Sequence, residues 1–99
     1  MTRYYQGDTV RLRAVFTSWD RLRADPTDIT LTVYSRSREH IGDPIPIGPE
    51  HRVSEGVYEC DYTLPVGHDM IVYEFRGLDE QGRPMLSRTT IAPVWSLAR

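Results

Sequence analysis

Four segments of this chain alternate apolar and polar side chains with a period of two. Successive side chains of a β-strand point to opposite faces, so this pattern predicts strands with one buried face and one solvated face. The predicted inward positions are Val10, Leu12, Ala14 and Phe16; Ile29, Leu31 and Val33; Tyr58, Cys60, Tyr62 and Leu64; and Ile71, Tyr73 and Phe75. Four such strands within 99 residues favour two antiparallel sheets packed face to face.

Turn signals divide the chain into about seven strand-length pieces. The predicted strands cover a short first piece at Tyr4-Tyr5, then 9–17, 28–35, 56–64, 70–76 and a last piece over 85–95 with a bend at Pro93. The proline-rich stretch 42–49 fits an edge strand or an extended loop, because proline cannot donate to a ladder. No window has apolar residues at helical spacing. The expected fold is therefore all-β: one immunoglobulin-like, two-sheet antiparallel β-sandwich over residues 1–99, with almost no helix.

Composition narrows the class of protein further. The net charge of −2 gives no support for nucleic-acid binding, and all twelve basic residues are arginine. No apolar run is long enough to cross a membrane, and residues 1–7 lack the apolar core of a signal peptide. Cys60 is the only cysteine, so no intrachain disulfide is possible, and its place among inward positions predicts a small buried hydrophobe.

Two sets of motifs resemble known families. Glu55-Gly56-Val57-Tyr58-Glu59-Cys60 is similar to the Gly-x-Tyr-x-Cys segment of immunoglobulin domains, in which the tyrosine hydroxyl bonds back to the chain upstream. The partner cysteine and the core tryptophan are missing, which argues against an antibody-type domain.

A second resemblance covers most of the chain. Its pieces are Gly7-Asp8-x-Val10-x-Leu12, Asp25-Pro26-Thr27-x-Ile29-Thr30-Leu31-Thr32-Val33-Tyr34, Gly56-Val57-Tyr58-x-x-x-Tyr62-Thr63-Leu64-Pro65 and Tyr73-x-Phe75-Arg76-Gly77. This order resembles small immunoglobulin-like proteins encoded among the structural genes of tailed bacteriophages and prophages, and also sandwich modules of bacterial surface proteins. The phage resemblance implies a virion part, such as a head decoration, head–tail or tail component, and it implies no catalytic residue.

The histidine, serine and aspartate residues form no recognisable catalytic or metal-binding motif in the sequence. His40, His51 and His68 lack metal-ligand spacing, and Ser54 near His51 lacks a nucleophile elbow. Asp8, Asp25 and Asp28 could line a cation site, although aspartate more often shapes turns. We therefore expect no catalytic, cofactor-binding or metal-binding residues, and a protein that is not an enzyme.

Two surface segments are candidates for partner contact. The loop Trp19-Asp20-Arg21-Leu22-Arg23 contains Trp19, Arg21, Leu22 and Arg23, of which tryptophan and arginine are enriched at interface hot spots. The alternative is that Trp19 folds back and caps the core. Arg36 and Arg38 could pair with acidic groups of a partner, or could simply be solvated. The position of Trp95, in the core or on the tail, stays open.

These expectations combine into one function and one alternative. The first is a non-enzymatic phage or prophage structural protein, assembled in the bacterial cytoplasm and located in the virion. It would bind capsid or tail subunits, or itself in a symmetric assembly, and neither nucleic acid nor membrane. The alternative is a sandwich module that binds carbohydrate or a cell surface, for which Tyr4, Tyr5 and Tyr34 are possible contact residues.

Overall fold

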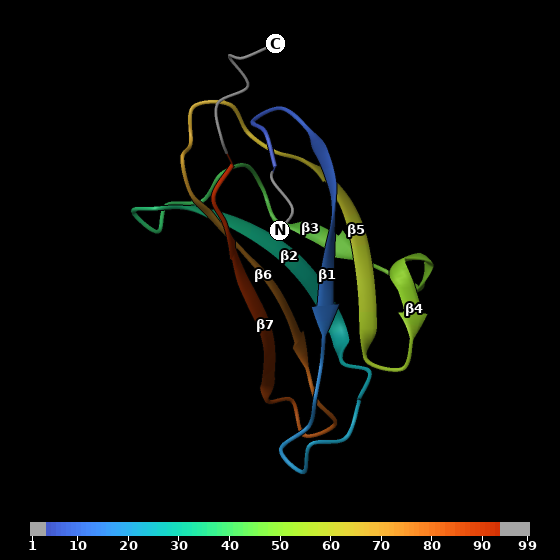
Figure 1. The fold of residues 1–99 in the computed structure, drawn as a ribbon. Helices are drawn as coiled ribbons and strands as arrows, with labels where there is room; N and C mark the ends of the chain where they lie inside the picture. The colour runs from blue at the N-terminus through green and yellow to red at the C-terminus, as the bar shows by residue number, and fades with distance from the viewer. Residues whose placement is uncertain (1–3, 94–99) are drawn as a thin grey trace.

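The computed structural model describes residues 4–93 and contains two antiparallel sheets (Figure 1). The strands are β1 (Thr9–Val15), β2 (Thr27–Ser35), β3 (Ile45–Ile47), β4 (Arg52–Ser54), β5 (Val57–Thr63), β6 (Ile71–Leu78) and β7 (Pro84–Ile91), and one short 3₁₀ helix, η1 (Pro49–His51), precedes β4. One sheet has the order β1-β5-β4 and the other β3-β2-β6-β7. Among the described residues, no helix is long and apolar enough to cross a membrane.

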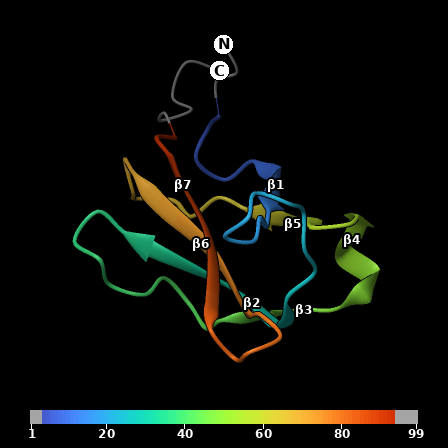
Figure 2. The same cartoon turned by 90° about the horizontal axis from the view of Figure 1, so that it is seen from below.

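The strand order confirms the predicted fold class. Figure 2 shows the two sheets as separate layers, with β1 and β7 on one side of the sandwich and β3 and β4 on the other. The two sheets match the B-E-D and C′-C-F-G sheets of immunoglobulin domains, taking β1 as strand B and β7 as strand G. The chain therefore has the immunoglobulin-like arrangement without a counterpart of strand A as a named strand in residues 4–93.

The core consists mainly of the predicted inward positions; Ile47 of β3 and Ile91 of β7 join it, while Val10 and Tyr62 are only partly buried against it. Buried residues from both layers form one cluster: Leu12, Ala14, Phe16, Ile29, Leu31, Val33, Ile47, Tyr58, Cys60, Leu64, Ile71, Tyr73, Phe75 and Ile91. Phe16 packs edge-on against Tyr58 at 5.9 Å between ring centroids, which joins the end of β1 to β5. Burial of Cys60 confirms that this side chain is part of the packed core.

Three local expectations differ from the structure. Tyr4 and Tyr5 belong to no named strand, whereas β4, which was not predicted, pairs with β5. The β4 residues are all exposed, so they show no alternation, and a hairpin with β5 holds them in place. Glu74 was expected on a solvated face, yet it is 6% exposed, because Arg88 of β7 lies on it and donates from Nε at 2.9 Å.

The ends of the predicted strands are also informative. The stretch 42–49 does contain an edge strand, β3, which pairs only with β2 among the described residues. The last predicted strand ends at Ile91, and Trp95 lies outside the described residues.

Candidate functional site

Three connections meet at one end of the sandwich and enclose an open cleft of about 840 Å³. They are the β1–β2 loop over 16–26, the β4–β5 turn at 55–56 and the β6–β7 turn over 79–83. The cleft is lined by Thr17, Ser18, Trp19, Asp20, Leu22, Arg23, Ala24, Asp25, Glu55, Asp79, Glu80, Gln81, Arg83, Pro84, Met85 and Leu86. This is the lower end of the molecule in Figure 1, where the two longer turns approach each other. Immunoglobulin variable domains carry binding loops at the corresponding end of the sandwich.

The loop that carries Trp19 is a small hairpin held by its own hydrogen bonds. Thr17 and Arg23 form an isolated antiparallel bridge at its base. Above that bridge the Ser18 amide donates to the Leu22 carbonyl at 2.8 Å, and the Arg21 amide donates to the Ser18 carbonyl at 2.9 Å. The Ser18 hydroxyl also contacts the Asp20 carboxylate. The hairpin is therefore ordered by backbone geometry rather than by burial of Trp19.

The apolar side chains of this end are strongly exposed. Trp19 is 86% exposed and Leu22 is 65% exposed, and Leu86 on the opposite wall of the cleft is 51% exposed. The interpretation in which Trp19 caps the core is thus wrong. A tryptophan held in water on a hydrogen-bonded turn leaves apolar area ready for contact with a partner.

The β6–β7 turn has the same geometry as the Trp19 hairpin. The Asp79 amide donates to the Arg83 carbonyl at 2.8 Å, and Gly82 takes the left-handed position that Arg21 takes in the other loop, with φ of 76° and 68°. The Asp79 carboxylate accepts from the amides of Gln81 and Arg83 and from the Arg83 guanidinium. These bonds, chiefly that from the Arg83 amide, lower the pKa of Asp79. Both walls of the cleft are therefore preorganised.

The Asp25 carboxylate connects the end of the β1–β2 loop to the β4–β5 hairpin through hydrogen bonds. It accepts from Arg52 Nη2 at 3.0 Å, from the Gly56 amide at 2.8 Å and from the Tyr58 hydroxyl at 3.2 Å. The Arg52 hydrogen bonds, followed by the Gly56 amide, hold the pKa of Asp25 below its ordinary value. Sequence reasoning treated Asp25 as a turn former and missed this role.

The Tyr58 contact also corrects the first family resemblance. In immunoglobulin domains the corner tyrosine lies on strand F and bonds to backbone a few residues upstream. Here Tyr58 lies on β5, between β1 and β4, and bonds to a side chain 33 residues upstream. The Gly-x-Tyr-x-Cys match therefore falls on a different strand of the fold.

The charges around the cleft divide into paired and unpaired groups. Asp25 is paired with Arg52, and Asp79 with Arg83. Within the described chain no ion pair engages Asp20, Glu55 or Glu80 on the acidic side, nor Arg21 or Arg23 on the basic side. The cleft therefore combines exposed apolar side chains with solvated charges of both signs.

The structure separates the predicted contact residues into two groups. The end of the sandwich that carries the cleft, called the loop end below, contains Trp19, Arg21, Leu22 and Arg23. Arg36 and Arg38 lie on the β2–β3 turn, which is at the other end because β2 runs away from the cleft. Arg36 pairs within the chain, with Asp69 at 3.0 Å. Arg36 is thus already paired within the chain, although its side chain remains largely exposed. Arg38 is exposed and has φ of 70° in a turn like that of Arg21.

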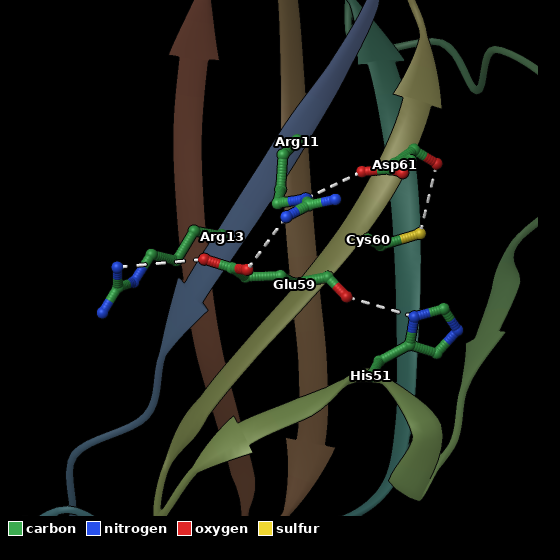
Figure 3. A network of polar contacts seen from close by, with 6 residues as sticks. All are labelled: Arg11, Arg13, His51, Glu59, Cys60 and Asp61. Atoms are coloured by element: carbon green, nitrogen blue, oxygen red, sulfur yellow. Dashed lines mark hydrogen bonds and ion pairs between the residues drawn. The ribbon is translucent and has the colours of Figure 1, made fainter.

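A second polar cluster lies on the outer face of the β1-β5-β4 sheet (Figure 3). Arg11 of β1 reaches Asp61 at 2.9 Å and Glu59 at 3.9 Å, and Arg13 reaches Glu59 at 3.8 Å. His51 contacts the Glu59 carbonyl rather than a side chain that could act as a nucleophile. The charges of this face neutralise one another, which makes it a weaker candidate for contact than the loop end.

The Cys60 thiol is expected to resist modification. Burial raises the pKa of this thiol, the nearby Asp61 carboxylate adds to the rise, and the side chain is 7% exposed. We expect reaction with a thiol reagent to be at least about tenfold slower in the native protein than in denaturant. Kinetic labelling checks this expectation, and rapid stoichiometric labelling of the native chain would contradict it.

The possible cation site does not assemble. Among residues 4–93, no group of three or more His, Cys, Asp or Glu side chains is placed to hold a metal ion. Asp25 is engaged by Arg52, Gly56 and Tyr58, while Asp8 accepts from the Tyr5 amide at 3.2 Å. Asp8 thus stabilises a local turn, and Asp25 links the β1–β2 loop to the β4–β5 hairpin.

Comparison with known proteins leaves the family open. No family model, no curated protein and no solved structure matches this chain. The function of the chain is therefore inferred from the geometry of the cleft and of the loops around it.

Proposed function

We propose that this protein is a non-enzymatic association module that binds a protein partner through the Trp19 hairpin and the adjoining cleft. The observation that carries the proposal is the 86% exposure of Trp19 on a turn that its own hydrogen bonds hold in place. A preordered loop loses little conformational entropy when it binds, so an exposed aromatic side chain on it contributes efficiently to affinity. Leu22 extends the apolar area, and the solvated charges supply a polar rim.

We further propose that the partner is a capsid or tail subunit and that the protein is a structural component of a phage or prophage particle. The small all-β sandwich and the motif resemblance support this assignment. Many copies on a shell or tail would add their adhesion, so each contact need not be strong. The test is to purify particles produced by a strain that carries the gene and to probe them for this chain. Absence of the chain from intact particles would refute the virion assignment.

Replacing Trp19 by alanine is expected to weaken association at least about tenfold while leaving the fold intact. Trp19 makes little contact with the core, so the unfolding transition should not move. Incorporation into particles, or affinity for the isolated subunit, measures the first effect, and urea unfolding measures the second. Val66→Ala, an exposed apolar residue at the other end, is the matched control. Normal incorporation of the Trp19 variant would exclude this site.

Substitution of Arg21 is expected to weaken association with the partner without reducing the stability of the fold. Its φ of 68° is costly for any residue with a Cβ, whereas glycine adopts it freely. The Arg21→Gly variant is therefore expected to keep its unfolding free energy or gain up to about 1 kcal/mol, while association weakens because the guanidinium is lost. Parallel unfolding and binding measurements check this. A variant that binds normally would show that the Arg21 guanidinium makes no contact with the partner.

A carbohydrate ligand is the second candidate function, and one observation favours it. Exposed Trp19 stands beside the carboxylates of Asp20, Glu55 and Glu80 around an open cleft, and a sugar could stack on the ring and donate hydroxyls to the acids. A glycan array probed with the isolated protein distinguishes the candidates. Specific glycan binding that Trp19→Ala abolishes would favour this function over association with a subunit.

A further inference from the structure

The edge strands on the two sides of the sandwich differ in length. On one side the edge strands are β3 and β4, each three residues long, and β3 contains Pro46. On the other side they are β1 with seven residues and β7 with eight (Figure 2). Within residues 4–93, β1 pairs only with β5 and β7 only with β6. Short strands and proline protect an edge from further pairing. β1 and β7 are both long, and the one proline of β7, Pro84, is its first residue and leaves the rest of the strand without this protection.

Charge distinguishes the two long edges. Arg11 and Arg13 stand on the outer face of β1, so antiparallel pairing of two β1 strands about their middle would place arginines opposite each other. β7 carries a single charged residue, Arg88, and the buried Glu74 neutralises it within the same sheet. Asp61 and Glu59 of β5 pair with Arg11 and Arg13, so like charge opposes the pairing of two β1 strands only in part. β7 carries one arginine, so two β7 strands can pair without bringing arginines opposite each other.

We propose that β7 pairs antiparallel with β7 of a second copy of this chain, so that two four-stranded sheets become one continuous sheet across a twofold axis. A register centred on Ser87 places Leu86 of each copy opposite Arg88 of the other. The aliphatic part of that arginine then covers Leu86, which is 51% exposed in the single chain. A twofold contact of this kind closes on itself, so the product is a dimer rather than a fibre.

The experiment is sedimentation of the full chain over micromolar to submillimolar concentrations, with the Leu86→Lys variant beside it. Lysine at this position faces Arg88 of the other copy, so dimerisation should weaken at least about tenfold. Val53→Lys is the matched control, because Val53 is an exposed apolar residue on the edge strand β4 and is 56% exposed. It should leave the dimer unchanged. Leu22→Lys, which alters the cleft without touching β7, should also leave it unchanged.

Hydrogen exchange gives an independent measurement of the same contact. The amides of β7 that point away from β6 should gain protection as concentration rises, while those of β3 should not. A chain that stays monomeric throughout this range would overturn the proposal. So would a dimer that resists Leu86→Lys but is lost in Leu22→Lys, since that result would place the contact at the loop end.

Discussion

The Gly56→Ala variant is expected to lose about 3 kcal/mol of unfolding free energy, because a methyl group at this position meets two obstacles. The backbone at Gly56 has φ of 74°, which a residue with a Cβ adopts only at a cost. The added Cβ would also lie 2.7 Å from the Phe16 carbonyl oxygen and 3.1 Å from the Ala24 amide nitrogen. Both neighbours are backbone atoms of the β1–β2 loop, so relief requires the loop itself to move.

The matched control for this variant is Gly42→Ala. Gly42 has nearly the same φ, 75°, but a Cβ there has no neighbour within 4 Å. It should therefore show only the conformational cost, about 1 kcal/mol, and the difference between the variants isolates the close approach at Gly56. Urea unfolding of both proteins measures this difference. Equal losses would mean that the loop base does not pack against the β4–β5 turn as described.

The alternation of side chains was enough to predict most of the fold, because it is a local consequence of the pleat. Residues such as Leu31 and Phe75 are fully buried, at the positions where a period of two places them. β4 was missed since all its residues face solvent and only its hairpin partner keeps it extended. Glu74 was misplaced because its burial depends on Arg88, which lies on another strand.

The candidate site was predicted less completely, since it depends on segments distant in sequence. The Trp19 hairpin was recognised from residue types, but its exposure depends on hydrogen bonds between Ser18 and Leu22 that no propensity indicates. The second wall of the cleft, residues 79–86, lies about sixty positions further along the chain and was read only as a polar loop and the start of a strand. Arg36 and Arg38 stand in a polar segment much like that of Arg21 and Arg23. The direction of β2, however, places the two arginine pairs at opposite ends of the sandwich.

The Asp25→Ala variant is expected to lose about 2 kcal/mol of unfolding free energy at neutral pH. It leaves the Gly56 amide and the partly buried Tyr58 hydroxyl without their acceptor, and it frees Arg52. The carboxylate is about one-third exposed, and water replaces part of what is lost, which keeps the effect below the sum of three charge-assisted bonds. The base of the Trp19 loop should loosen as well, so this variant should also bind its partner more weakly. Tyr58→Phe removes only the hydroxyl bond and should cost about half as much or less.

The stability difference between the wild type and Asp25→Ala should depend on pH in one direction. The pKa of Asp25 lies below its ordinary value of 3.8 in the folded protein, mainly because of the Arg52 hydrogen bonds. Between the folded and unfolded pKa values the unfolded chain binds more protons, so stability rises with pH there. The contribution of Asp25 is therefore complete above its unfolded pKa and is lost as pH falls through the lower folded pKa. Other aspartates with lowered pKa values, Asp61 and Asp69 among them, are present in both proteins and cancel in the difference. Urea unfolding of the pair from neutral pH into acid measures the curve, and a difference that stays constant through acid would mean that the Asp25 anchor does not form.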